Sequence, residues 1–223
     1  FVFRTLARPP GERLSTFATV NDVHFGEVEC GVMEGLEMGP TFRVADGQEP
    51  YPETMNRGAI HEIEQIVPDA VVVKGDLTSE GTQEQYDDFL AHYGESFGEL
   101  MVHVRGNHES FHSPGMAAFS HQRIDLPGVT IALLDTSRDG HATGHVTGEQ
   151  LAWLRDTANE ADRPILLMGH HHVWSPETAG RPENYFGIDP DASERLLEVV
   201  AAHRNIRGYF AGHTHRNRVR TIS

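Results

Sequence analysis

The chain has 223 residues, 38% of them hydrophobic, and carries 18 basic against 33 acidic side chains for a formal net charge of -15. This length fits one domain with a full core, so we expect residues 1–223 to form a single domain. The acidic balance argues against a nucleic-acid partner, because most of the surface would repel phosphate groups.

The sequence also limits membrane association and cysteine chemistry. No apolar run approaches the roughly 18 residues of a membrane-spanning helix, so we expect no membrane partner. The N-terminus has no basic-then-apolar signal pattern, which favours a cytoplasmic location; an exported form whose signal has been removed is the alternative. Cys30 is the only cysteine, so any metal must be held by nitrogen and oxygen.

The first predicted strand leads into a possible metal-binding pair. Phe1–Arg13 is irregular, and Leu14–Val20 alternates as a strand that ends just before Asp22 and His24. Side chains alternate in a strand, so these two would point the same way and reach one metal ion; a polar turn is the alternative. The Gly- and Glu-rich stretch Phe25–Pro52 predicts a long loop of the kind that is often functional.

A helix and a buried strand follow. Apolar residues at helical spacing predict a helix over Glu53–Val67, which Pro68 ends. Asp69–Lys74 contains a continuous apolar run, typical of a strand covered on both faces. Asp76 comes just past that strand. Its two carboxylate oxygens can bridge two cations, although an N-cap for the next helix, Thr82–Phe97, is the alternative.

The third polar strand end is the richest in donor types. Leu100–Val104 predicts a strand, and after it come Asn107, His108 and Glu109. Asparagine offers an amide oxygen to a metal, histidine a nitrogen or a proton, and glutamate an outer acceptor. Phe111–Pro127 is predicted to be a loop or a short helix.

Two further strands and a helix precede a run of histidines. Val129–Leu134 and Ile165–Met168 predict short apolar strands, and Thr147 caps a predicted helix that ends near Glu160. His170–His172 follows the second of these strands. Three consecutive histidines cannot all face one point, and a tag remnant is the alternative interpretation.

The last motif follows the last predicted strand. Trp174–Pro190 is predicted to be a loop, Ala192–His203 a helix and Ile206–Ala211 a buried strand. His213 and His215 come next, two residues apart at the strand end, so they also would point the same way.

Strand–helix alternation predicts an α/β domain whose polar strand ends gather at one sheet edge. Arg216–Ser223 is predicted to begin one more strand. The side chains expected at that edge are Asp22, His24, Asp76, Asn107, His108, His170, His213 and His215.

The ordered series Asp-x-His, Gly-Asp, Gly-Asn-His-Glu, Gly-His and Gly-His-x-His resembles the calcineurin-like metallophosphoesterase family, over residues 15–216. The layout looks most like the bacterial branch of cyclic-nucleotide and glycerophosphodiester phosphodiesterases. The resemblance implies a four-layer αββα sandwich. Family members usually continue with further strands after the last motif, and only eight residues follow His215, so we expect a missing C-terminal part or a trimmed chain.

The resemblance divides the metal ligands into two sets joined by one bridging carboxylate. The first metal would be held by Asp22, His24 and His215, the second by Asn107, His170 and His213, and Asp76 would bridge the two. His108 would lie near the phosphate as a charge stabiliser or general acid, oriented by Glu109. The mixed nitrogen and oxygen set suits two divalent or trivalent ions of Mn, Fe or Zn.

The expected activity is hydrolysis of a small-molecule phosphate ester, with phosphodiesters favoured, by a metal-bridging hydroxide that His108 assists. Two cations about 3.5–4 Å apart lower the pKa of a bridging water and clamp the ester oxygens. A phosphomonoesterase or nucleotide pyrophosphohydrolase on the same site is the alternative. The full ligand set disfavours a non-catalytic scaffold, and the acidic charge disfavours a nuclease.

Several residues outside the motifs have two interpretations. Tyr185, Phe186 and Trp174 either stack on a base or cover the site, with packing favoured. Five histidines either line the cleft or serve packing and the surface: His112, His141, His145, His171 and His172. Substrate choice is expected to depend on the loops 25–52 and 174–190.

Overall fold

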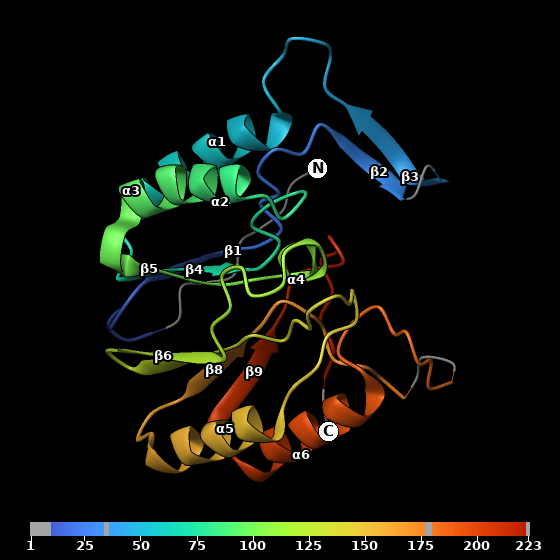
Figure 1. The fold of residues 1–223 in the computed structure, drawn as a ribbon. Coiled ribbons are helices and arrows are strands. Elements are labelled where there is room, and N and C mark those ends of the chain that lie inside the picture. The colour runs from blue at the N-terminus through green and yellow to red at the C-terminus, as the bar shows by residue number, and fades with distance from the viewer. Residues whose placement is uncertain (1–9, 34–35, 177–179, 222–223) are drawn as a thin grey trace, which may run out of the picture.

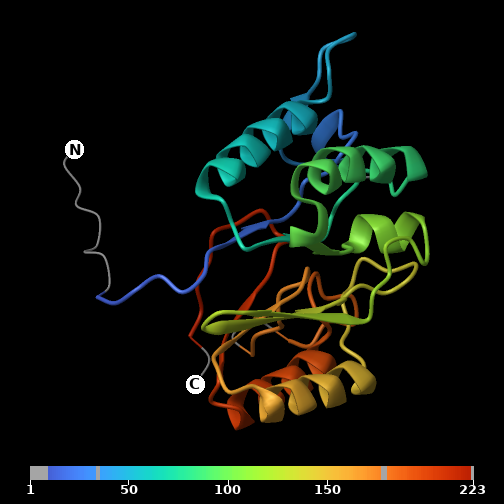
Figure 2. The ribbon, with the colours of Figure 1, turned by 90° about the vertical axis from the view of Figure 1, so that its left-hand side faces the viewer.

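The computed structural model describes residues 10–33, 36–176 and 180–221, and in it two sheets lie face to face between two layers of helices (Figures 1 and 2). The first sheet is parallel, in the order β1-β4-β5. Its strands are β1 (Phe17–Val20), β4 (Ala70–Lys74) and β5 (Met101–Val104).

The second sheet has the order β6-β7-β8-β9, with β6 antiparallel to β7 and the other pairs parallel. Its strands are β6 (His121–Leu126), β7 (Val129–Leu134), β8 (Ile165–Met168) and β9 (Ile206–Phe210). The α/β class and the four-layer αββα order predicted from the sequence are confirmed.

Helices cover the outer face of each sheet (Figure 1). Over the first sheet lie α1 (Tyr51–Ile66), α2 (Gln83–Phe89), η1 (Leu90–Gly94), α3 (Glu95–Phe97) and η2 (Gly98–Leu100). Over the second lie α5 (Gly148–Glu160) and α6 (Pro190–Ala202), and α4 (Asn107–His112) follows β5 at the edge where the two sheets meet. The helix predicted over Thr82–Phe97 is real but contains one π-helical turn, η1.

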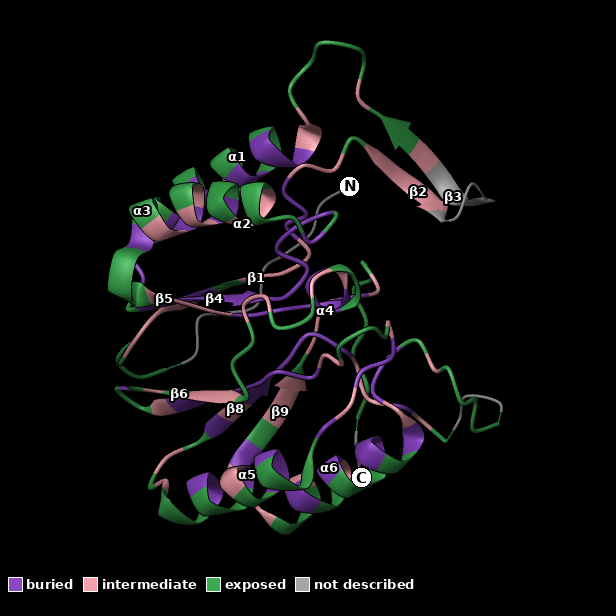
Figure 3. Cartoon of the chain, viewed as in Figure 1, coloured by how far each residue is buried: buried purple, intermediate pink, exposed green. Residues whose placement is uncertain are grey.

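Alternation along the strands divides the core into three layers. Figure 3 shows buried residues in β4 and on the helices of both outer layers. In β4, Val71 and Val73 pack toward the helices, while Val72 packs between the sheets. In β7, Leu134 faces the helices and Leu133 faces the first sheet. Both faces of β4 are fully buried, so the end of this strand is fixed in position. A fixed strand end can hold the functional residues that follow it in a constant place.

Capping residues fix where several helices begin. Thr147 accepts from the backbone of Gln150, whose side chain accepts from Thr147 N in return, which confirms the predicted start of α5. The Thr82 side chain caps α2. Asp76 therefore does not cap α2, which was the alternative interpretation of this residue.

Two predicted irregular stretches contain strands, and these predictions are wrong. Phe25–Pro52 contains a hairpin, β2 (Glu29–Met33) and β3 (Leu36–Arg43), that projects from the sandwich (Figure 1). Its described β2 residues are only partly buried, so it lacks the alternating apolar face that reveals a strand in a sequence. Phe111–Pro127 contains β6, a mostly polar strand at the sheet edge.

The predicted strand over Arg216–Ser223 is also wrong as far as the structure describes it, because residues 216–221 have no regular secondary structure. The remainder of that range lies outside the described residues. Residues 1–9 of the predicted irregular N-terminus lie outside them as well. Of the helices in the described part of the chain, none combines the length and apolar character of a bilayer span.

Candidate metal centre

The loops that follow five strands meet at one edge of the sandwich and are tied together by backbone hydrogen bonds. Asp22 N donates to Gly75 O at 3.0 Å, which joins the ends of β1 and β4. Gly212 N donates to His170 O at 2.9 Å, which joins the ends of β8 and β9. Between the sheets, His213 N donates to Asp22 Oδ1 at 2.8 Å. The two sheets therefore share one rigid rim.

Asp22, His24 and His215 form one group of possible metal ligands at this rim, with ligand atoms all within 4.8 Å of one another. The Nε2 atoms of His24 and His215 lie 3.3 Å apart, and His215 Nε2 lies 3.6 Å from Asp22 Oδ1. The His215 side chain is 49% exposed while those of Asp22 and His24 are buried, so the group opens to solvent on the His215 side.

A second group lies around His170. Its Nε2 is 3.2 Å from Asp76 Oδ2 and 3.1 Å from Asn107 Oδ1. The same Asp76 Oδ2 is 3.7 Å from His24 Nε2 in the first group. One carboxylate oxygen therefore lies between the two groups, where a ligand shared by two cations would have to be.

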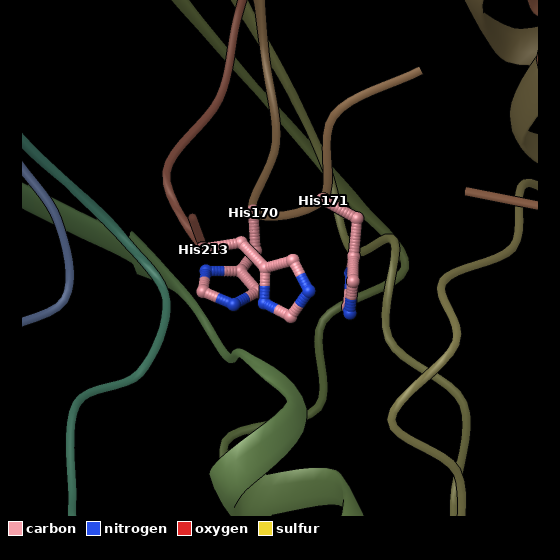
Figure 4. Close-up of side chains that lie close together, drawn as sticks. All are labelled: His170, His171 and His213. Carbon is pink, nitrogen blue, oxygen red and sulfur yellow. The ribbon is translucent and has the colours of Figure 1, made fainter. Parts of the chain in front are cut away.

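His213 lies against His170 and His171, at ring-centroid distances of 5.0 and 4.7 Å (Figure 4). These three buried histidines form a further group with ligand atoms within 4.8 Å. His171 Nδ1 is 2.9 Å from Thr136 Oγ1, and His170 is the member that also contacts Asp76. The arrangement favours His170 over His171 as the ligand that joins the bridged pair.

The hydrogen bonds of this rim fit a cation. His170 Nδ1 donates to Lys74 O at 2.9 Å, so Nε2 is the nitrogen that faces the oxygens of Asp76 and Asn107, where either a proton or a metal ion would have to lie between them. Within the described residues, neither buried ring nitrogen of His213 has a hydrogen-bond partner. A buried polar atom without a partner is costly, and bound cations would satisfy these lone pairs together.

The pKa values of His170 and Asp76 also indicate that this site favours positive charge. Burial alone would lower the pKa of His170, but the neighbouring Asp76 carboxylate outweighs it and raises that pKa to about 9. Burial would raise the pKa of Asp76, yet the histidines around it, His170 foremost, hold it well below the usual value. The site thus favours positive charge even with protons alone, and a metal would compete with the proton for His170 Nε2.

Backbone geometry explains why glycine precedes several of the motifs. A Cβ on Gly75, whose φ is +83°, would lie 2.5 Å from His170 Nδ1, and one on Gly106 would overlap Asp76 Oδ1. Five of the seven candidate ligands adopt the left-handed region, which non-glycine residues rarely occupy. Positive φ angles occur at Asp22 (56°), His24 (46°), Asp76 (49°), His213 (74°) and His215 (47°).

Comparison with known proteins agrees with this geometry. The model of the calcineurin-like phosphoesterase family matches residues 15–217. The chain belongs to the calcineurin-like phosphoesterase family.

Curated relatives of this phosphoesterase domain include a probable cyclic nucleotide phosphodiesterase of Synechococcus sp., 28% identical over 69% of this chain and 60% of that protein. A glycerophosphodiester phosphodiesterase of Enterobacter lignolyticus is 29% identical over 66% of this chain and 56% of that protein. The chain thus spans little more than half the length of these relatives. Among solved structures, a dimetal phosphatase from Danio rerio has the same fold, with a TM-score of 0.66, 16% identity, and coverage of 92% of this chain and 82% of that one.

His108 lies beside His24 and Asp76 of the candidate metal centre. Its ring centroid is 4.7 Å from that of His24, and it shares a 4.8 Å group with His24 and Asp76. His108 Nδ1 donates to Ser79 O at 2.5 Å, so Nε2 is the nitrogen left for chemistry. The partner that fixes the ring is a backbone carbonyl, for which the sequence carries no signal.

The expectation that Glu109 orients His108 is wrong. The fully buried Glu109 carboxylate instead accepts from Thr78 N at 2.8 Å, Thr78 Oγ1 at 2.6 Å and Gly106 N at 2.7 Å. These hydrogen bonds tie the loop after β4 to the start of α4. Glu109 is therefore a structural residue that holds the two loops carrying Asp76 and Asn107 together.

We expect Glu109→Ala to lower the free energy of unfolding by about 3–5 kcal/mol, because three buried donors lose their acceptor. Urea unfolding of the metal-free protein measures this change. Glu109→Gln keeps one oxygen acceptor for Thr78 and should cost clearly less. Equal stability of Glu109→Ala and the wild type would contradict the assignment.

Packing gives two further residues a structural role. Arg105 is buried and pairs with Asp135 at 2.8 Å and with Asp139 at 2.6 Å. Trp174 is only 5% exposed and Arg181 lies over its ring, so it packs rather than presenting a stacking face.

Buried histidines make the metal-free protein sensitive to acid. Burial lowers the pKa of His24 and His103 to about 4 and that of His213 to about 3. The unfolded chain binds a proton at each of these rings near pH 6.5, whereas the folded chain does so only at lower pH. The contribution of the neutral rings to folding stability is therefore complete above pH 6.5 and is lost as the pH falls toward 4. His170 and His215 have raised pKa values, so they make the folded state less stable as the pH rises, but they are fewer than the histidines with lowered pKa values.

We therefore expect the metal-free protein to unfold at lower urea concentration at pH 5 than at pH 7.5. His103→Gln removes one such group outside the candidate centre, next to the Tyr86 hydroxyl at 3.0 Å. This variant should reduce the pH dependence of the unfolding free energy by about one proton between pH 4 and 6.5. A wild type equally stable at both pH values would contradict the prediction.

Proposed function

We propose that this phosphoesterase domain hydrolyses phosphodiesters with two bound metal ions. Asp22, His24 and His215 would hold one ion, Asn107, His170 and His213 the other, and Asp76 both. The observation that carries the proposal is the position of Asp76 Oδ2, 3.2 Å from His170 Nε2 and 3.7 Å from His24 Nε2.

The ligand chemistry supports two ions of the Mn, Fe or Zn type. Imidazole nitrogens combined with carboxylate and amide oxygens suit these metals, whereas Mg²⁺ prefers nearly all oxygen. When bound, such a pair supplies an activated water and neutralises charge on the phosphoryl oxygens. The names of the two curated relatives, a cyclic nucleotide and a glycerophosphodiester phosphodiesterase, favour diesters as substrates.

The chain's own contribution to the chemistry centres on His108. Because Nδ1 is held by Ser79 O, Nε2 is the atom that can donate to the phosphate or to the leaving oxygen. The imidazolium form carries a proton there, which serves either to stabilise negative charge or to protonate the departing alkoxide. His215, the most exposed member of the ligand groups, marks the side from which substrate enters.

The test is hydrolysis by the purified chain after reconstitution with Mn²⁺. We expect cleavage of bis(p-nitrophenyl) phosphate, slower cleavage of p-nitrophenyl phosphate, and loss of both activities on chelation. Preference for the monoester would replace the diester assignment with a phosphomonoesterase. Two bound ions per chain without cleavage of either substrate would overturn the proposed function.

A further inference from the structure

The turn that follows His24 carries a carboxylate to which the proposed function gives no role. Glu27 N donates to His24 O at 3.1 Å, so residues 24–27 form a β-turn with Gly26 at its third position, where φ is +84°. A positive φ at that position is typical of a type II turn and favours glycine. The turn brings the Glu27 side chain back to the His24 ring, and Glu27 Oε1 lies 3.9 Å from His24 Nδ1.

The first turn of α1 holds this β-turn in place. Tyr51 donates its hydroxyl to Glu27 Oε2, and Gly26 N donates to Glu53 Oε1 at 2.9 Å. The Glu27 side chain is only 12% exposed, so it is packed as well as hydrogen-bonded. Because Oε2 is bonded to Tyr51, Oε1 is the oxygen that remains to face His24.

The two ring nitrogens of His24 have different surroundings. Nε2 lies 3.3 Å from His215 Nε2 and 3.7 Å from Asp76 Oδ2, which places it at the candidate metal centre. Nδ1 is buried, and the described part of the chain offers it no hydrogen-bond partner. A neutral histidine that gives Nε2 to a metal carries its proton on Nδ1, and a buried N–H without an acceptor is costly. A small rotation of the Glu27 side chain would bring Oε1 within hydrogen-bond distance of that proton.

A carboxylate partner has a different effect on a ligating histidine from that of a backbone carbonyl. In the second group, His170 Nδ1 donates to Lys74 O, which is uncharged. A hydrogen bond from Nδ1 to a carboxylate is charge-assisted and therefore stronger. It also makes the other ring nitrogen more basic, and so a better metal ligand. Glu27 would thus strengthen the interaction of His24 Nε2 with a cation.

We propose that Glu27 is a positioning residue for the first metal ion, one that accepts a hydrogen bond from His24 Nδ1 and so fixes the tautomer that presents Nε2 to the metal. The inference rests on the proposed function, because that ion is the one assigned to Asp22, His24 and His215. Among the described residues, no cluster of possible ligand atoms within 4.8 Å of one another includes Glu27. Glu27 therefore acts through His24 and does not bind the metal itself.

The first test measures the affinity of each ion by chelator competition with the Zn²⁺-loaded protein. Glu27→Ala should weaken one ion about 10–100-fold, the range for loss of an outer partner of a metal ligand, and leave the other unchanged. Glu27→Gln keeps an oxygen that can accept from Nδ1 and should recover most of the affinity. Glu29→Ala is the matched control, because that carboxylate lies two residues further along and pairs with Arg43 of β3. It should change neither affinity.

A second variant shows which ion responds. Asp22→Ala should retain only the ion held by Asn107, His170 and His213. Adding Glu27→Ala to this variant should not weaken the remaining ion any further. A further loss would mean that Glu27 supports the rim as a whole, which would overturn the inference.

The Nδ1 proton provides a readout that general support of the loop would not affect. In long-range ¹H–¹⁵N spectra of the Zn²⁺-loaded wild type, we expect a slowly exchanging, downfield Nδ1–H signal that is missing from His24→Ala. Glu27→Ala should abolish this signal or move it upfield, while Glu29→Ala should leave it in place. An unchanged signal in Glu27→Ala would assign the proton to another acceptor and overturn the inference.

The inference and the proposed function fail in different ways. Unchanged affinities in Glu27→Ala, or equal weakening of both ions, would overturn the inference and leave the proposed function intact. A wild type that binds no metal would overturn both. Two bound ions, one of them weakened in Glu27→Ala, without hydrolysis of any phosphoester would keep the role of Glu27 and reject the proposed function.

Discussion

Asp76→Ala is expected to reduce bound metal from two ions per chain to none after dialysis against metal-free buffer. One Asp76 oxygen lies between the two ligand groups, so its loss removes a ligand and a negative charge from both. Losing even an outer partner of a metal ligand costs about 10–100-fold in affinity, and a shared ligand should cost more. Elemental analysis of the reconstituted protein gives the stoichiometry.

Asp22→Ala is the matched variant, because the proposal assigns Asp22 to the first ion only, although its carboxylate also lies within 4.8 Å of ligand atoms of Asp76 and His170. We expect it to retain one ion, held by Asn107, His170 and His213. Far-UV circular dichroism of both metal-free variants shows whether the fold survives. An Asp76→Ala protein that still holds one ion at wild-type affinity would exclude the shared carboxylate, and one that holds two would exclude the centre itself.

The sequence placed the candidate ligands correctly at strand ends, but the reason differs in part from the one expected. The sequence predicts that strand alternation brings Asp22 and His24 to the same side. In the structure β1 ends at Val20, and both residues have positive φ angles. They converge because left-handed turns curl the loop around Asp76, and their backbone is held by hydrogen bonds to the loop after β4.

What the sequence could not predict depends on contacts between distant segments. The buried strands were recognised because each is a short apolar run, and this fixed the α/β class. The hairpin β2–β3 and the edge strand β6 have no such run and were missed. The role of Glu109 depends on Thr78, 31 residues away, and the packing of His213 depends on its contact with Phe186. Neither contact has a local signal.

His108→Ala is expected to lower kcat about 10²–10⁴-fold, the range for loss of a positioned acid or base, while both metal ions remain bound. His108 lies beside His24 and Asp76, and because its Nδ1 donates to Ser79 O, its Nε2 is the atom that can meet the substrate. His112→Ala is the matched control. That ring is on the same helix, 6.4 Å from His108 and exposed, and its loss should change kcat less than twofold or so.

The dependence on the leaving group separates the two roles open to His108. A p-nitrophenolate departs without a proton, whereas an alkoxide needs one. If His108 is a general acid, the defect of His108→Ala should be much smaller on bis(p-nitrophenyl) phosphate than on an alkyl diester. An equal defect on both substrates assigns it to stabilising charge on the phosphoryl oxygens, which every diester develops. Loss of metal in His108→Ala would contradict both roles and make His108 a ligand, since its ring already shares a group with His24 and Asp76.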